Sequence, residues 1–140
     1  MVRSRILVVE DSKFFSNLVC QAVAERIDAD VVAALTFAET RAAYETATVP
    51  FNLALVDLVL PDDREGEAAN GLQERGVPCI VFTGFFSEDL RERLLALRII
   101  DYVVKDTPAS LDYLLNLVER LHRNRGIKVM VVDDSRVARS

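Results

Sequence analysis

A short apolar segment with a carboxylate near its end, LALVDL from Leu53 to Leu58, shows the pattern on which the fold of this chain rests. Its apolar residues follow one another without the polar alternation of a half-exposed strand, which is typical of a strand covered on both faces. Other runs share this character, the last of them more weakly: Ile6–Val9, Cys79–Phe82, Ile99–Val104 and Val31–Leu35. The sequence therefore predicts five strands buried between two layers.

Segments with helical spacing separate these runs. Apolar residues recur at intervals of three and four from Phe15 to Val23, and again from Leu111 to Leu121. Thr36 and Ser87 fit the N-caps of two more helices, and a weaker helix is expected within Glu65–Arg75. Strictly alternating strands and helices form a parallel sheet with right-handed crossovers and helices on both faces. We therefore expect a doubly wound α/β domain.

Composition narrows the class of protein. The chain has 140 residues, 51% of them apolar, which is enough for one folded domain with a sizeable core. With 22 acidic and 17 basic residues its net charge is −5, which disfavours direct nucleic-acid binding. Cys20 and Cys79 lack metal-ligand spacing and indicate buried thiols in a reducing compartment. No apolar run approaches the roughly 20 residues that span a bilayer, so we expect no membrane partner and a cytoplasmic location.

The end of the chain repeats its beginning. Lys128–Arg136 matches the character of Arg5–Lys13 position by position, at an offset of 123 residues. A repeat at this spacing predicts one domain over residues 1–125, followed at 126–140 by a linker and the first strand of a truncated second copy. A chance resemblance between two short buried strands is the alternative.

Polar residues stand at the ends of the predicted strands. Glu10 and Asp11 follow the first, Asp57 lies at the end of the third, Thr83 of the fourth and Lys105 of the fifth. Open α/β sheets bind ligands at the carboxyl ends of their strands, so these side chains are expected to meet at one edge. Three carboxylates suit a hard divalent cation, best Mg²⁺, and the metal with a lysine would neutralise a phosphoryl group attacked by Asp57.

Each of these residues also has a plain structural explanation. A Glu-Asp pair before a helix is often an N-cap, and Asp57 fits the cap of a turn. Thr83 would satisfy backbone groups and Lys105 would be solvated. Their joint placement on four strand ends favours a common site.

Four motifs resemble the receiver domain of bacterial two-component response regulators, over residues 1–125. They are Val8–Ser12, Leu55–Pro61, Val81–Gly84 and Asp101–Lys105. The resemblance implies a five-stranded, flavodoxin-like parallel sheet of strand order 2-1-3-4-5 with helices on both faces. It also implies a regulatory domain and not an enzyme.

The resemblance implies a chemical role for the acidic residues. Asp57 would accept a phosphoryl group from a phosphohistidine on a sensor histidine kinase or a phosphotransfer protein. Glu10, Asp11, Asp57 and the backbone carbonyl of Val59 would bind Mg²⁺.

The remaining family positions concern the switch. Thr83 and Lys105 would contact the phosphoryl oxygens, and Tyr102 matches the aromatic residue whose ring turns inward as Thr83 moves. The alternative for Tyr102 is a plain core aromatic with a polar tip. The surface of the fourth helix, fifth strand and fifth helix, roughly Ser87–Arg125, would serve a homodimer or the output.

Some features depart from the family pattern. Asp106 stands where the family has proline after the lysine, and the acidic stretch Pro61–Glu67 suggests altered access to Asp57. These departures keep open a second hypothesis, a docking or dimerisation module without phosphoryl transfer. A Mg²⁺-dependent phosphohydrolase is disfavoured because Val59 stands where such enzymes carry a second aspartate. His122, among arginines near a helix end, is expected to be solvated.

The output lies beyond the predicted receiver. Tandem receivers at an N-terminus resemble those that precede diguanylate cyclase domains. The sequence therefore suggests a second receiver and a diguanylate cyclase as partners in cis.

Overall fold

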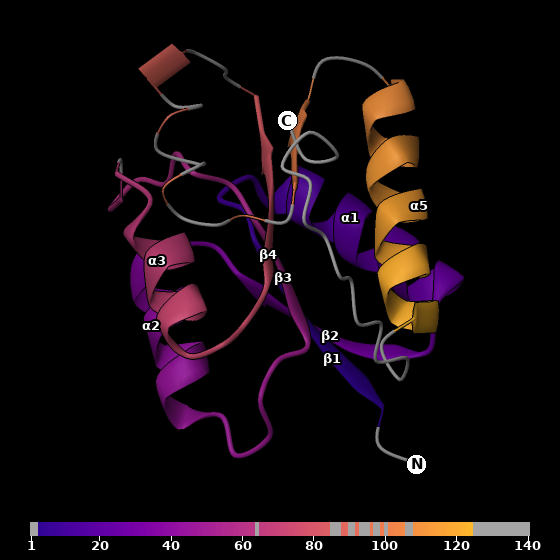
Figure 1. Cartoon of the computed structure of the whole chain (residues 1–140), viewed down its shortest axis with the longest axis horizontal. Coiled ribbons are helices and arrows are strands. Elements are labelled where there is room, and N and C mark those ends of the chain that lie inside the picture. The colour runs from indigo at the N-terminus through magenta and orange to yellow at the C-terminus, as the bar shows by residue number, and fades with distance from the viewer. Residues whose placement is uncertain are drawn as a thin grey trace, which may run out of the picture.

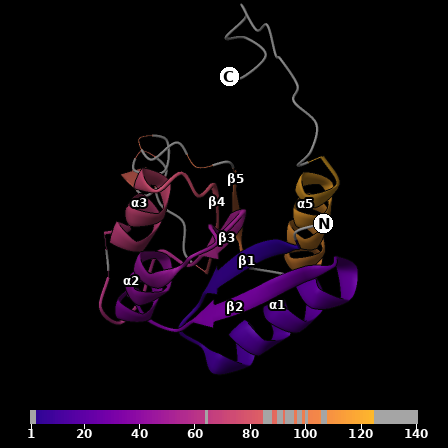
Figure 2. The same ribbon diagram turned by 90° about the horizontal axis from the view of Figure 1, so that it is seen from below.

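The computed structural model describes residues 3–63, 65–84, 88, 89, 92, 96, 99, 101–105 and 108–124. In these residues a sheet is covered on both sides by helices (Figures 1 and 2). The predicted fourth helix at Ser87 lies largely outside the described residues, and so do Asp106 and the whole of residues 126–140. Among the helices in the described ranges, none combines the length and apolar character needed to cross a bilayer.

The sheet has five parallel strands in the order β2-β1-β3-β4-β5. The strands are β1 (Ser4–Val9), β2 (Ala29–Ala34), β3 (Leu53–Val56), β4 (Cys79–Thr83) and β5 (Asp101–Val104). The predicted doubly wound sheet and its strand order are confirmed. The sequence placed the start of β2 two residues too late, because the ladder already includes Ala29 and the charged Asp30. It placed the start of β5 two residues too early, because the apolar run begins before the ladder does.

Four helices are described: α1 (Lys13–Arg26), α2 (Phe37–Thr46), α3 (Glu67–Glu74) and α5 (Pro108–Asn124). In β1, Leu7 and Val9 belong to the apolar cluster under α2 and α3. Ile6 and Val8 belong to the opposite cluster under α1 and α5. Because neighbouring residues of a strand point to opposite faces, this double burial explains the unbroken apolar runs.

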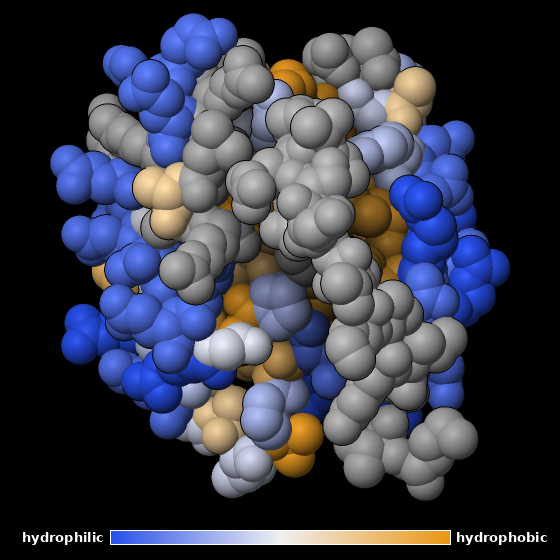
Figure 3. Space-filling view, in the orientation of Figure 1, coloured by the Kyte–Doolittle hydropathy of each residue, from blue (hydrophilic) through white to orange (hydrophobic). Residues whose placement is uncertain are grey.

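Hydrophilic side chains cover the outer surface on the α2–α3 side and on the α5 side (Figure 3). Apolar side chains are visible between these two sides. Both cysteines are free thiols. Cys79 is fully buried in the α2–α3 cluster, and Cys20 is half-buried on α1. Burial raises the pKa of the Cys79 thiol to about 12, so this cysteine stays protonated.

Side-chain caps begin two of the helices. The Ser12 hydroxyl accepts a hydrogen bond from Phe15 N at 3.2 Å at the start of α1. The Thr36 hydroxyl accepts one from Glu39 N at 3.0 Å at the start of α2. The Glu39 carboxylate in turn accepts a hydrogen bond from Leu35 N at 3.1 Å, one residue before the cap, so the two side chains form a reciprocal pair.

Gly71 permits α2 and α3 to approach each other. A Cβ at this position would overlap the Tyr44 hydroxyl and crowd its ring. The Arg75 guanidinium also contacts this ring, with its carbon 4.7 Å from the ring centroid. The glycine inside a short helix is therefore explained by packing, which the helical pattern of the sequence does not reveal.

Candidate functional site

The predicted site residues follow the carboxyl ends of neighbouring strands. Glu10 comes directly after β1, Asp57 after β3 and Lys105 after β5, while Thr83 is the last residue of β4. Backbone bonds extend the ladder to these positions. Asp57 N donates to Val9 O at 2.9 Å, and Lys105 N donates to Thr83 O at 2.8 Å. The regular sheet thus fixes the starting point of each side chain.

Three carboxylates meet at this edge of the sheet. One oxygen of each of Glu10, Asp11 and Asp57 lies within 4.8 Å of the others. Glu10 and Asp57 are buried, and Asp11 is exposed. An all-oxygen donor set of this kind fits Mg²⁺, which prefers hard ligands and keeps several waters.

The Lys105 ammonium joins the carboxylates. Its Nζ lies 2.9 Å from Asp57 Oδ2 and also forms an ion pair with Glu10 Oε1. The Lys105 side chain is 17% exposed, against 6% for Glu10 and 9% for Asp57. One ammonium against three carboxylates leaves the pocket negative, which favours a divalent cation.

Burial raises the pKa of Glu10 above its ordinary value of 4.5. The hydrogen bond from Lys105, the backbone bond from Ser12 and the positive charge of Lys105 all lower this pKa, and together they only partly offset burial. A hydrogen bond to Asp11 raises it further. Glu10 therefore gains from a cation that stabilises its ionised form.

Hydrogen bonds hold the Asp57 carboxylate in place. Oδ1 accepts from Val59 N at 3.0 Å, while Oδ2 accepts from Lys105. Val59 itself is 48% exposed in the loop after β3. Asp57 is thus presented at a rigid strand end with both oxygens oriented.

Thr83 brings an unsatisfied hydroxyl to the same edge. Thr83 is 1% exposed, and within the described ranges its Oγ1 has no hydrogen-bond partner. A buried hydroxyl in this condition costs about 1–3 kcal/mol. A functional role, in which the hydroxyl binds a ligand atom, is one explanation for such a group.

Tyr102 lies on β5 and is 36% exposed. Both interpretations of Tyr102, as the switch aromatic and as a core aromatic with a polar tip, stay predictions. Its strand β5 pairs with β4, which carries Thr83.

Two aspartates of the acidic stretch after β3 bind backbone N–H groups at the starts of α2 and α3. The Asp62 carboxylate accepts from Phe37 N at 2.7 Å and from Ala38 N at 3.0 Å, at the start of α2. Asp63 is buried and accepts backbone bonds from Glu65, Glu67 and Ala68 at the start of α3. These carboxylates are engaged at helix N-termini, where negative charge is stabilised. Altered access to Asp57 stays a prediction.

Two aromatic residues that the sequence placed only among apolar runs lie beside the site. Lys105 Nζ is 4.6 Å from the ring centroid of Phe15 and 5.7 Å from that of Phe82. Spacing along the chain gives no signal for this contact, because it depends on how α1 packs against β4.

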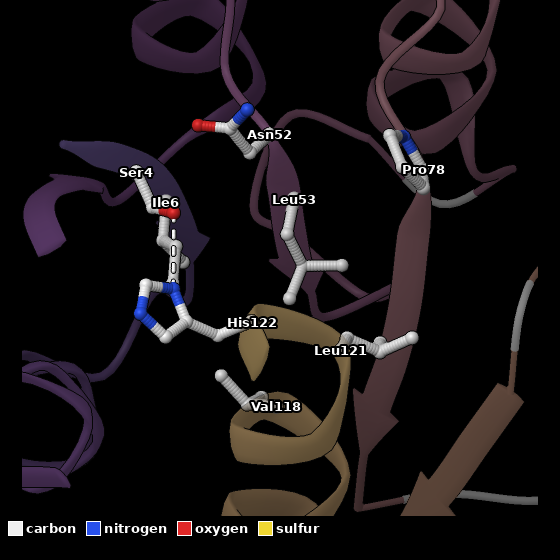
Figure 4. Close-up of a pocket in the computed structure, with 8 residues that line it drawn as sticks. All are labelled: Ser4, Ile6, Asn52, Leu53, Pro78, Val118, Leu121 and His122. Carbon is white, nitrogen blue, oxygen red and sulfur yellow. Dashed lines mark hydrogen bonds between the residues drawn. The ribbon is translucent and has the colours of Figure 1, made fainter. Parts of the chain in front are cut away.

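A cavity of about 190 Å³ lies at the opposite edge of the sheet (Figure 4). Its lining residues are Ser4, Ile6, Asn52, Leu53, Pro78, Val118, Leu121 and His122. His122 was expected to be solvated, but it is half-buried and its Nδ1 lies 3.0 Å from the Ser4 hydroxyl. It packs against the amino end of β1, whereas the carboxylates follow the other end of the strands.

Comparison with known proteins places this arrangement in a family. The chain is 38% identical over 125 residues to a response regulator receiver protein of Anaeromyxobacter sp. (strain Fw109-5), a match that covers 87% of this chain and 47% of that protein. No protein-family model matches the chain.

Solved structures agree with this match. A crystal structure of a two-component system response regulator/GGDEF domain protein is 42% identical, with a TM-score of 0.80, over 98% of this chain and 55% of that one. A CheY-like receiver domain protein from Methanospirillum hungatei JF-1 is 26% identical, with a TM-score of 0.76, over 91% of this chain and 100% of that one. The chain spans about half the length of the longer relatives that it matches. The chain belongs to the response regulator receiver domains with the CheY-like fold, a family of regulatory domains of two-component systems.

Proposed function

We propose that Asp57 accepts a phosphoryl group from a phosphohistidine on a sensor histidine kinase or a phosphotransfer protein. An Asp57 carboxylate oxygen forms a bond to phosphorus while the bond from phosphorus to the imidazole nitrogen breaks. The electron pair of that bond stays on the nitrogen of the donor. The observation that carries the proposal is the meeting of Asp57 with Lys105 and two further carboxylates at one sheet edge.

Mg²⁺ is the cofactor in this proposal. Glu10, Asp11 and Asp57, with the backbone carbonyl of Val59, are the residues that would hold it. When bound, the metal would neutralise the charge on the phosphoryl oxygens. The support is the all-oxygen donor set and the negative balance of the pocket.

Lys105 and Thr83 complete the proposed site. The Lys105 ammonium, already paired with Asp57, would contact a phosphoryl oxygen once phosphorus is bound. The buried Thr83 hydroxyl has no partner among the described residues, so it gains a charge-assisted bond by turning to the new anion.

Tyr102 is the proposed readout of this movement. A shift of Thr83 on β4 would open space into which the exposed Tyr102 ring turns from β5. The surface from Ser87 to Arg125 would then serve a homodimer or an output domain. Of that surface, β5 and α5 are described almost completely.

The proposed full-length protein is a cytoplasmic regulator. Residues 1–125 would form the receiver, and 126–140 a linker and the first strand of a second receiver. A diguanylate cyclase would follow in cis, a suggestion supported by a relative that is described as a GGDEF domain protein. The sequence repeat at Lys128–Arg136 supports the tandem arrangement.

Labelling with a small phosphodonor tests the proposal. The wild-type chain should gain one phosphoryl group from an acyl phosphate in the presence of Mg²⁺, and Asp57→Asn should gain none, because an amide cannot serve as the acceptor. Intact-mass spectrometry measures the gain. Asp28→Asn is the matched control, since its carboxylate is 83% exposed and pairs with Arg3 away from the site.

Equal labelling of the wild type and Asp57→Asn would remove Asp57 from its proposed role. No labelling of the wild type, together with retained self-association, would favour the docking module instead.

A further inference from the structure

The ammonium of Lys105 lies between charged and aromatic groups. On one side it pairs with Glu10 and Asp57, and it also lies over the ring of Phe15 at 4.6 Å. The ring of Phe82 is 5.7 Å from the same nitrogen. An ammonium within about 6 Å of an aromatic face is attracted by the negative face of the ring.

The two rings form one wall. Their centroids are 5.3 Å apart and their planes are inclined by 32°. Phe82 is 5% exposed on β4, and Phe15 is half-buried on α1. A cavity of only about 10 Å³ remains among Phe15, Phe82, Glu10 and Asp57. Since a buried water needs about 10–15 Å³, this space holds one water at most.

The turn before α1 couples the Phe15 ring to the carboxylates. Ser12 N donates to Glu10 Oε2 at 3.0 Å, and the Ser12 hydroxyl accepts from Phe15 N at 3.2 Å. One residue thus orients a carboxylate partner of Lys105 and the backbone that carries its aromatic partner. The ring is placed by a cap and by packing on Phe82, and not by a flexible loop.

The chemistry of lysine makes such contacts relevant to the position of its ammonium. Its ammonium is a strongly hydrated point charge on a flexible stem, and here the side chain is only 17% exposed. In the proposed transfer, the ammonium exchanges its contact with Asp57 for a contact with a phosphoryl oxygen. During that exchange the aromatic wall keeps an attractive partner in place.

We propose that Phe15, backed by Phe82, is a positioning residue that holds the Lys105 ammonium in the pocket through a cation–π contact. The role in transfer rests on the proposed function, whereas the contact itself does not. Phe15 acts through Lys105 and is not itself a catalytic residue.

Two substitutions distinguish the effect of the π face of Phe15 from the effect of its volume. Phe15→Leu keeps an apolar side chain of similar size but removes the π face, and Phe15→Tyr keeps that face. Cation–π contacts of this kind predict labelling about 2- to 30-fold slower in Phe15→Leu at saturating Mg²⁺, and a wild-type rate within about 2-fold in Phe15→Tyr. Cys20→Ala, half-buried on the same helix, is the control for a general loosening of α1 and should label at the wild-type rate.

A spectroscopic measurement on the unphosphorylated chain tests the contact without any labelling. In the wild type the ε-methylene resonances of Lys105 should show ring-current shifts. These shifts should be largely lost in Phe15→Leu and kept in Phe15→Tyr and Cys20→Ala. Loss of the shifts in Phe15→Leu, together with slower labelling that Phe15→Tyr restores, would support the proposal.

Other results would overturn it. Unchanged Lys105 resonances in Phe15→Leu would show that the ring does not contact the ammonium. Equally slow labelling in Phe15→Leu and Phe15→Tyr would show that the π face is not what matters. If the wild type itself takes no label, the proposed function fails and the role of Phe15 in transfer fails with it, which the wild-type sample alone reveals.

Discussion

At the scale of single residues, the pocket is a balance of charges that burial makes costly. Glu10 and Asp57 are largely withdrawn from water and share one ammonium, while Asp11 adds a third carboxylate at the rim. Removing the ammonium from such a group leaves buried charge without compensation. Lys105 therefore contributes to stability as well as to the proposed chemistry.

Replacing Lys105 by methionine measures this contribution. Lys105→Met should lower the free energy of unfolding by about 2 kcal/mol without Mg²⁺, less than the 3–5 kcal/mol of fully buried pairs because Lys105 is 17% exposed. Mg²⁺ should stabilise this variant more than the wild type, since the metal replaces the missing positive charge. Urea unfolding with and without Mg²⁺ checks both statements.

Lys13→Met is the control for this prediction, because Lys13 is an exposed lysine at the first position of α1. It should leave both the stability and the effect of Mg²⁺ close to those of the wild type. A Mg²⁺ effect no larger in Lys105→Met than in the wild type would contradict the charge balance described for the pocket.

At the scale of elements, short polar contacts and one glycine fix how the helices join the sheet. Asp62 and Asp63 cap α2 and α3 from the loop that follows Asp57. Gly71 lets α3 approach Tyr44 of α2. These contacts hold the loop after β3 against two helices and so restrain the surroundings of the site.

Asp62 gives a dependence on pH. Backbone hydrogen bonds, chiefly from Phe37 N, lower the pKa of Asp62 below its ordinary value of 3.8. A lowered folded-state pKa contributes stability above pH 3.8, and that contribution is lost as the pH falls through the folded-state value. Asp62→Ala should therefore be less stable than the wild type at neutral pH, with a difference that shrinks in acid.

Urea unfolding of both proteins from neutral pH to below pH 3.8 measures this difference. Asp62→Asn serves as the control, because it keeps one acceptor oxygen and loses the charge. A difference between wild type and Asp62→Ala that is constant over the whole range would contradict the capping role of the charge.

Gly71→Ala tests the contact between α2 and α3. Alanine in a helix interior is normally more stable than glycine by about 0.5–1 kcal/mol, but here the added Cβ would overlap Tyr44. We expect a net loss of about 1–2 kcal/mol, since overpacking costs about 1–3 kcal/mol. In a Tyr44→Ala background the same change should become stabilising, and thermal unfolding of the four proteins gives the coupling. The same loss with and without Tyr44 would refute the steric explanation.

At the scale of the whole molecule, the sequence predicted the layers because both faces of the sheet are buried. The unbroken apolar runs at Ile6–Val9 and Leu53–Leu58 reflect the two apolar clusters, and the strand order followed from the family resemblance. Polar residues at strand ends predicted the meeting of Glu10, Asp57 and Lys105, because parallel strands end at a common edge.

The features that the sequence did not predict depend on contacts between distant elements. Phe15 belonged to the apolar stripe of a helix, and nothing in its spacing indicates a lysine from β5 above its ring. The capping of α2 by Asp62 was not predicted either, because it depends on where α2 begins relative to the loop after β3. The sequence indicated a solvated helix end for His122, because its contact with Ser4 depends on how α5 packs against β1.

The whole molecule is organised to present Asp57 at one edge of the sheet, so the location of the phosphoryl group tests the central claim most directly. The wild-type chain is labelled with an acyl phosphate and Mg²⁺, the acyl phosphate is trapped by borohydride reduction, and fragment-mass spectrometry locates the reduced residue. The account predicts that the reduced residue is Asp57 and no other carboxylate. A reduced residue at Glu10, at Asp11 or at any other position, or no trapped residue at all, would contradict it.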